Sequence, residues 1–142
     1  MSEPFGYSYL LDLYGCENRQ HINFLSDADL MYGFLEKLPT LIDMETFSPP
    51  LIIKEPAKYV PKLDARGELI RFPTYPDTAG VSGVIFLITS SIVLHTIEPK
   101  GFASIDVYSC KEYDPRVVFD ECKKFFGFKD FDEQFLTRGI RY

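Results

Sequence analysis

The chain has 142 residues, of which 46% are hydrophobic and 25% charged, and its formal net charge is −6. This length suits one domain spanning residues 1–142, and the hydrophobic fraction excludes a disordered chain. The negative charge, without a stripe of Lys and Arg, argues against nucleic acid as a partner. No apolar run approaches the ~20 residues that a membrane helix needs, and the start lacks the pattern of a secretory signal. We therefore expect a cytoplasmic protein with no membrane partner.

The first half of the chain predicts one strand, one helix and an irregular segment. Residues 7–14, "YSYLLDLY", are typical of a strand that ends at the turn "GCEN". Residues 27–38 place apolar side chains at helical spacing, with Ser26 as the expected N-cap and the end before Pro39. Residues 39–83 hold seven of the ten prolines, which favours short edge strands joined by loops.

The second half predicts an antiparallel meander of three strands, at residues 84–89, 92–96 and 103–109. The first two strands are separated by Ser90 and Ser91, and the next two by "EPKG".

A second helix and a last strand complete the predicted fold. The helix spans residues 114–126, with Asp114 as N-cap, Pro115 at the first position and Gly127 past the end. The side chains expected to face the sheet are those of Val118, Cys122 and Phe125. The last strand covers residues 132–137. Together these elements predict an α+β fold, a two-layer α/β sandwich with a mainly antiparallel sheet and two helices on one face.

Three cysteines, Cys16, Cys110 and Cys122, are widely spaced and form no CxxC pair. Neither a disulfide framework nor a metal site is indicated. Cys16 and Cys122 are interpreted as small buried hydrophobes.

The stretch "TSSIVLHT", residues 89–96, combines two serines with one of only two histidines in the chain. Strand alternation places Ser91 and His95 on one face and Ser90 on the other, so contact between Ser90 and His95 requires a bend. From spacing alone, serines in a strand reversal and a hydrogen-bonded structural histidine explain the pattern. Both this interpretation and a catalytic one place a bend at the serines.

Several ordered segments resemble a known family. They are "GVSGVIFLITSSIVLHT", "GFASIDVYSC", "LLDLYGC", "FFGF" and "LTRG". Taken in their order along the chain, they resemble the small prokaryotic S-adenosylmethionine decarboxylase proenzymes, which are pyruvoyl-dependent. The resemblance covers about half of the chain well.

The resemblance implies a self-cleaving enzyme. Ser90 becomes the pyruvoyl precursor, and cleavage between positions 89 and 90 leaves a β chain of residues 1–89 and an α chain of residues 90–142. Ser82 and His95 match the residues that assist processing. The only cofactor is then the pyruvoyl group derived from Ser90.

The resemblance also implies the decarboxylation chemistry. The pyruvoyl ketone forms a Schiff base with the amine of the substrate and serves as electron sink when CO2 leaves. Cys110 matches the general acid that returns a proton to the substrate. The alternative role for Cys110 is that of a small buried hydrophobe at a strand end. Family members form dimers whose sheets or edges meet to build two shared sites, so a homodimer is expected.

Two departures from the family pattern leave alternatives open. The family usually carries Glu before the reactive serine and His after it, whereas this chain has Thr89 and Ser91. Ser91 is therefore a second candidate precursor. An unprocessed homologue that acts as a binding or regulatory subunit is the alternative to an enzyme.

The substrate-binding positions also depart from the family. The carboxylate that binds the ribose is matched by Glu98, one place early, with Pro99 in its position. The aromatic residue that stacks on the nucleoside aligns with Pro76, and its neighbours are Phe72, Tyr75 and Asp77. S-adenosylmethionine is the leading substrate, in polyamine and spermidine synthesis. Relatives of the family decarboxylate arginine or ornithine, and Asp77 would suit such a cation.

The proline-rich insertion at residues 45–75 is longer than in compact members. It is either a surface elaboration or a lid or wall of the pocket.

Overall fold

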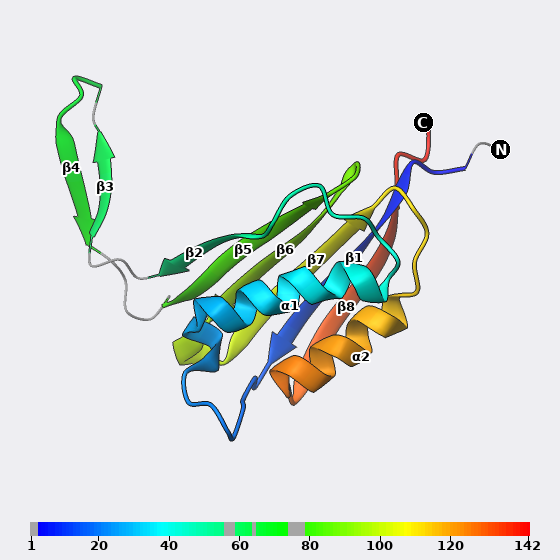
Figure 1. Cartoon of the computed structure of the whole chain (residues 1–142), viewed down its shortest axis with the longest axis horizontal. Coiled ribbons are helices and arrows are strands. Elements are labelled where there is room, and N and C mark those ends of the chain that lie inside the picture. The colour runs from blue at the N-terminus through cyan, green and yellow to red at the C-terminus, as the bar shows by residue number, and fades with distance from the viewer. Residues whose placement is uncertain (1–2, 56–58, 64, 74–78) are drawn as a thin grey trace.

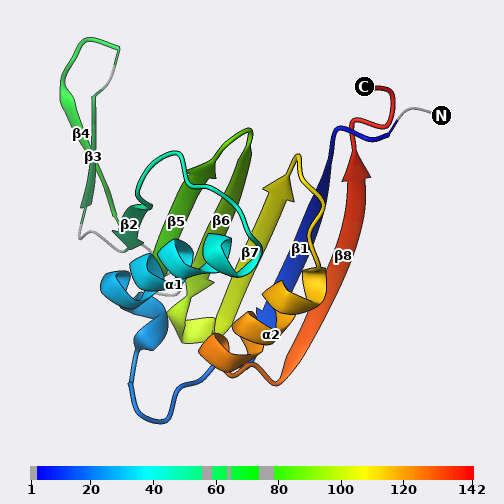
Figure 2. The same cartoon turned by 45° about the vertical axis from the view of Figure 1, so that its right-hand side comes forward.

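A six-stranded antiparallel sheet forms one layer of the molecule, and two helices form the other (Figures 1 and 2). The computed structural model describes residues 3–55, 59–63, 65–73 and 79–142. The strands are β1 (Gly6–Tyr14), β2 (Leu51–Glu55), β3 (Tyr59–Leu63), β4 (Leu69–Pro73), β5 (Gly80–Leu87), β6 (Ser90–Ile97), β7 (Phe102–Ser109) and β8 (Asp130–Arg138). The helices are α1 (Ala28–Leu41) and α2 (Pro115–Phe126), with short 3-10 turns η1 (Phe24–Ser26) and η3 (Glu98–Lys100).

The order of strands in the large sheet is β2-β5-β6-β7-β1-β8, and every neighbouring pair is antiparallel. Both α1 and α2 lie across the same face of this sheet (Figure 2). The predicted fold class is thereby confirmed. In the described part of the chain, no helix covers the opposite face, which we call the open face.

Strands β3 and β4 form a separate two-stranded sheet that extends away from the large sheet (Figure 1). They lie in the proline-rich segment for which short strands were predicted, and that prediction is confirmed. A role of this hairpin as a lid stays a prediction.

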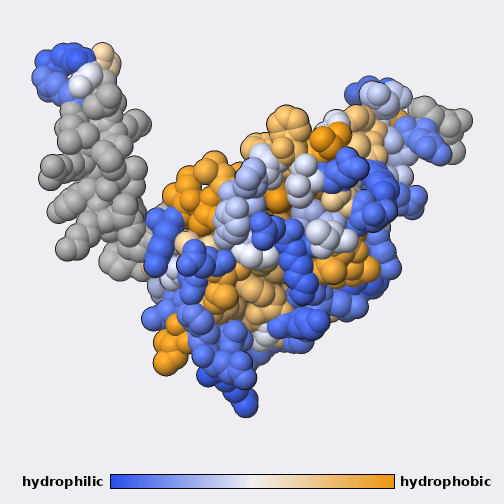
Figure 3. Space-filling model, viewed as in Figure 1, coloured by the Kyte–Doolittle hydropathy of each residue, from blue (hydrophilic) through white to orange (hydrophobic). Residues whose placement is uncertain are grey.

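The hydrophobic core lies between the sheet and the helices. Alternate residues of the central strands point into it, and the fully buried side chains include Leu11, Leu13, Ile85, Ile92, Leu94 and Ile105 from the sheet and Met31, Leu35, Leu38 and Phe126 from the helices. On the face that carries the helices, hydrophilic residues cover much of the surface, with hydrophobic patches between them (Figure 3). Cys16 and Cys122 belong to the core, as predicted.

The ends of α1 differ from the prediction. Asp27, not Ser26, is the N-cap, because its extended backbone lets the side chain accept a hydrogen bond from the Leu30 amide at 3.0 Å. Ser26 closes η1 instead. Pro39 lies within the last turn of α1, so this helix ends three residues later than Leu38.

Helix α2 follows the prediction at both ends. Asp114 is the N-cap, Pro115 is the first residue, and Gly127 adopts the left-handed conformation, φ 57°, just past the end. The prediction that Phe125 faces the sheet was wrong, because Phe126 is fully buried and Phe125 only partly. The ring of Phe125 packs instead against that of Phe34, with 4.7 Å between centroids.

In the part of the chain that the structure describes, the helices are too short or too polar to cross a bilayer.

Candidate active site

The turn between β5 and β6 consists of Ile88 and Thr89, and the pair Leu87 and Ser90 closes it. The prediction placed the bend at the two serines and was wrong by about two residues. Ser90 instead begins β6, where it pairs with Leu87 of β5, and its hydroxyl accepts a hydrogen bond from the Cys110 amide, which follows the end of β7. Such a contact between distant parts of the chain leaves no local signal in the sequence.

Thr89 adopts a left-handed backbone conformation with φ 59°. Non-glycine residues are uncommon there, and β-branched ones are outliers. The residue therefore marks a strained point at the bond that precedes Ser90.

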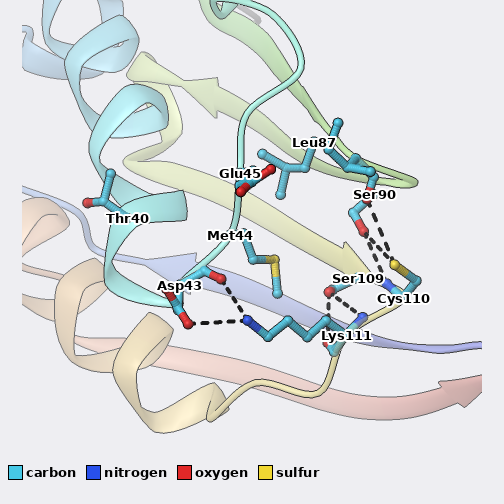
Figure 4. A pocket seen from close by; sticks show the side chains of 10 residues that line it. Thr40, Asp43, Met44, Glu45, Leu87, Ser90, Ser109, Cys110 and Lys111 are labelled. Atoms are coloured by element: carbon cyan, nitrogen blue, oxygen red, sulfur yellow. Dashed lines mark hydrogen bonds and ion pairs between the residues drawn. The ribbon is translucent and has the colours of Figure 1, made fainter.

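Ser90 and Cys110 lie side by side (Figure 4). The Ser90 Oγ is 3.1 Å from the Cys110 amide nitrogen and 3.8 Å from the Cys110 Sγ. The same sulfur lies 3.8 Å from the carbonyl oxygen of Ile88. Only 9% of Ser90 is exposed, whereas Cys110 is exposed, so the alternative role of Cys110 as a buried hydrophobe is wrong.

A cavity of about 610 Å³ opens beside this pair. Its other walls come from the end of α1, the loop after it and the start of the segment after β7, and Figure 4 shows the residues involved. The charged groups among them are Asp43, Glu45 and Lys111. The Lys111 ammonium donates to the backbone oxygen of Asp43 at 3.0 Å and to its carboxylate at 3.2 Å. Sequence analysis missed these three residues, and only the position of Lys111 directly after Cys110 could have indicated one of them.

Ser82 and His95 form a second pair, on the open face. They are directly opposite each other in β5 and β6, and the Ser82 Oγ lies 2.9 Å from the His95 Nδ1. His95 shares its face with Ser91, and Ser90 points to the other face, as alternation predicted.

Within one chain, the two pairs are far apart. Ser90 and His95 are five positions apart in β6, which corresponds to roughly 16 Å along the strand. The side chains also point to opposite faces of the sheet. The structure thus brings Ser90 together with Cys110 and Ser82 together with His95, but it does not bring the two pairs together.

Asp106 lies on the same face as His95, in the neighbouring strand β7. Partial burial raises the pKa of the Asp106 carboxyl, the Asp12 carboxylate raises it further, and His95 lowers it. This acid was another residue that sequence analysis missed. The signal for it was an acidic residue between two apolar ones in a strand, "IDV".

Glu98 lies in η3, at the end of β6 opposite to Ser90. Burial raises the pKa of its carboxyl, while hydrogen bonds from the amides of Leu25 and Ser26 act in the other direction. One carboxylate oxygen is buried without a partner, beside a second cavity of about 630 Å³. Within one chain, Glu98 is not part of the cavity at Ser90.

The remaining predicted substrate contacts are not placed. Phe72 lies on strand β4, and nothing is described of its side chain. Tyr75 and Asp77 lie outside the described residues. Among the described residues, no group of His, Cys, Asp and Glu side chains could hold a metal ion.

The chain is thus an antiparallel α+β sandwich with Ser90 at the head of a central strand, beside the exposed Cys110. Residues 7–139 match the family model described as S-adenosylmethionine decarboxylase, and the chain belongs to this family. The resemblance seen in the sequence is thus confirmed.

Two curated relatives illustrate the similarity. The S-adenosylmethionine decarboxylase proenzyme of Geobacillus kaustophilus is 39% identical over 62 residues, which are 44% of this chain and 50% of the relative. This match therefore spans only half the length of that relative. The proenzyme of the same name from Methanococcus maripaludis is 29% identical over 97% of this chain and 93% of the relative.

A solved structure has the same fold. The crystal structure of the adenosylmethionine decarboxylase from Aquifex aeolicus covers 98% of this chain and 94% of its own, with a TM-score of 0.70 and 22% sequence identity.

Proposed function

We propose that this protein is a self-processing, pyruvoyl-dependent decarboxylase that acts on S-adenosylmethionine in polyamine synthesis in the cytoplasm. Membership in the family and the names of its relatives, which are proenzymes, support this proposal. The observation that carries it is the contact between Ser90 and Cys110 at the wall of a cavity. The precursor serine becomes the reactive carbonyl, and the proton donor protonates the substrate held there. The two residues must therefore lie close together.

Processing would begin at the bond between Thr89 and Ser90. The Ser90 Oγ attacks the carbonyl carbon of Thr89, the C–N bond breaks, and the hydroxyl proton passes to the amine, which leaves an ester. Loss of the Cα proton then breaks the Cβ–Oγ bond and releases the carboxylate of Thr89. The remaining enamine becomes an imine, and water converts the imine to a ketone and ammonia. Ser90 fits this role better than Ser91, which points to the open face.

The residues around Ser90 fit a pyruvoyl group. Such a ketone supplies an electrophile that captures an amine and withdraws electrons as CO2 leaves. Cys110 would hold the proton that replaces CO2, because its Sγ is exposed and lies 3.8 Å from the Ser90 Oγ. The end of α1 and its following loop form one wall of the cavity.

We expect a homodimer in which each site uses residues of both chains. Ser82 and His95 cannot reach Ser90 of their own chain, since about 16 Å along β6 separates them from it. The open face that carries them also exposes large apolar side chains, those of Leu51, Ile53 and Phe86, each of them at least half exposed. A second copy would cover this surface and present its own Ser82 and His95 to the opposite site.

The choice of substrate is tested by release of labelled CO2. Processed protein should release it from S-adenosylmethionine and not from arginine or ornithine. Glu98, Phe72, Tyr75 and Asp77 are the residues that we propose for substrate recognition. Activity on a basic amino acid alone would replace the leading substrate while leaving the reaction class unchanged.

Self-cleavage is tested by the masses of the fragments in the purified protein. Purified wild-type protein should give two fragments on a denaturing gel, and Ser90→Ala should stay intact. Cleavage that persists in Ser90→Ala and is lost in Ser91→Ala would move the precursor by one residue. A wild-type chain that never splits and keeps its mass of 16.4 kDa would support the alternative of a non-catalytic partner subunit.

A further inference from the structure

The backbone conformation of Thr89 is unusual for its residue type. Three described residues other than glycine have a positive φ, namely Asn23, Asp43 and Thr89. Asn and Asp tolerate the left-handed region because their short polar side chains can bond to the nearby backbone, whereas a β-branched side chain is crowded there. Among the described non-glycine residues with a positive φ, Thr89 is therefore the one whose side chain is poorly suited to the left-handed region.

Neighbouring segments hold this turn on both sides. On one side, the Ile88 amide donates to the Glu45 carbonyl at 3.4 Å, and the Phe47 amide donates to the Phe86 carbonyl at 2.8 Å. On the other side, Cys110 contacts the Ile88 carbonyl through its sulfur and the Ser90 hydroxyl through its amide. A strained conformation persists only where its surroundings fix it in this way.

We propose that the left-handed conformation of Thr89 accelerates self-cleavage, so that Thr89 is a positioning residue for its own peptide bond. This inference rests on the proposed function. When the C–N bond after Thr89 is exchanged for a C–Oγ bond, the Oγ and Cβ of Ser90 enter the path of the main chain. Because Oγ and Cβ replace the nitrogen in that path, the turn becomes one atom longer, and residue 89 can leave the left-handed region. Strain that is present in the intact chain and released as the ester forms lowers the barrier to that step.

Three substitutions separate strain from other effects. Thr89→Asn and Thr89→Gly relieve the strain, because both residues tolerate a positive φ. Thr89→Val is the matched control, since it keeps the branched shape and loses only the hydroxyl. Each chain is made by cell-free synthesis, and the fraction cleaved is followed over time by intact mass. We expect Asn and Gly to slow cleavage about tenfold and Val to cleave at the wild-type rate.

The other outcomes overturn the proposal. Wild-type rates for Asn and Gly would show that strain contributes nothing. A slow Thr89→Val would assign the effect to the hydroxyl, and a slow Gly beside a normal Asn would assign it to chain flexibility.

A second measurement does not depend on cleavage. In the Ser90→Ala background, which cannot form the ester, Thr89→Asn should raise the Tm and Thr89→Val should not. An unchanged Tm in Thr89→Asn would contradict the strain itself. A wild-type chain that never cleaves would instead refute the proposed function, and the comparison of Tm would still test the strain.

Discussion

The three cysteine thiols lie in different environments, and this determines which of them can react. Cys110 is exposed, whereas Cys16 and Cys122 are buried. Burial, with a contribution from the Glu98 carboxylate, raises the pKa of the Cys16 thiol to about 12, and burial also raises the pKa of Cys122. Because only a thiolate is an effective nucleophile, the buried thiols should be inert in the folded protein.

We expect a thiol reagent at pH 8 to add one label to the native chain, at Cys110. Intact mass before and after Cys110→Ser measures this, since the variant should take up no label. Labelling of Cys16 or Cys122 before unfolding would contradict the buried positions of these two residues.

The N-cap Asp27 links the stability of α1 to pH. The hydrogen bond from the Leu30 amide lowers the pKa of the Asp27 carboxyl, and His21, whose Nε2 lies 3.0 Å from the carboxylate, lowers it further. A carboxyl whose pKa is lower in the folded state stabilises the protein at pH values above its ordinary pKa. This contribution is lost as the pH falls through the pKa of the folded state.

In the uncleaved Ser90→Ala background, Asp27→Ala should lower the free energy of unfolding by about 1 kcal/mol at pH 7. The difference should shrink as the pH falls below about 4. Urea unfolding at pH 7 and pH 3 measures both values. The control Asp27→Asn keeps the capping oxygen without the charge, so its stability at pH 7 should lie closer to that of the background chain. A difference for Asp27→Ala that is equal at both pH values would exclude this role.

At the scale of elements, strand β5 depends on a close approach to β6. A Cβ added at Gly80 would lie 1.9 Å from the carbonyl oxygen of Thr96, which is backbone and cannot move aside as a side chain could. Gly33, on α1, has open space around it.

We therefore expect opposite effects of the same substitution at two glycines. Gly80→Ala should destabilise the Ser90→Ala chain by about 1–3 kcal/mol through overpacking. Gly33→Ala should stabilise it by up to about 1 kcal/mol, because alanine has the higher helix propensity. Thermal unfolding measures both, and a neutral Gly80→Ala would show that β5 and β6 can separate at this end.

Sequence reasoning succeeded for elements whose signals are local. Helix α2 begins at Asp114 and Pro115 and ends at Gly127, and each of these residues acts through its own backbone. It failed where a distant segment decides. The hydroxyl of Ser90 accepts a hydrogen bond from the amide of Cys110, twenty residues later, and no local pattern indicates this contact. Phe126 is fully buried and Phe125 only partly, although both rings pack against those of Phe24 and Phe34.

At the scale of the whole molecule, the separation of His95 from Ser90 within one chain underlies our proposal that a second copy supplies His95. This predicts complementation between two inactive chains. His95→Ala keeps its own Ser90 but cannot assist a partner, and Ser90→Ala keeps its His95 but has no precursor.

Neither variant should cleave when it is made alone. When the two are co-expressed, the His95→Ala chain should be cleaved in mixed dimers, and intact mass identifies which chain was cut. A third substitution, Ile53→Asp on the open face, should prevent both dimerisation and cleavage when sedimentation and mass are compared. Cleavage of His95→Ala made alone would show that His95 is not needed for processing. Cleavage of a monomeric chain would show that a second copy is not needed.

The sequence by itself determined the α+β sandwich, most of its strands, helix α2 and the family, because alternation, capping residues and ordered motifs act over short stretches of chain. Only the tertiary structure decided what surrounds Ser90: the strained turn at Thr89, the contact with Cys110, and the charged wall of Asp43, Glu45 and Lys111. It also decided that Ser82 lies directly opposite His95. These features depend on strand register and on the packing of α1 over the sheet, which join residues far apart in the chain.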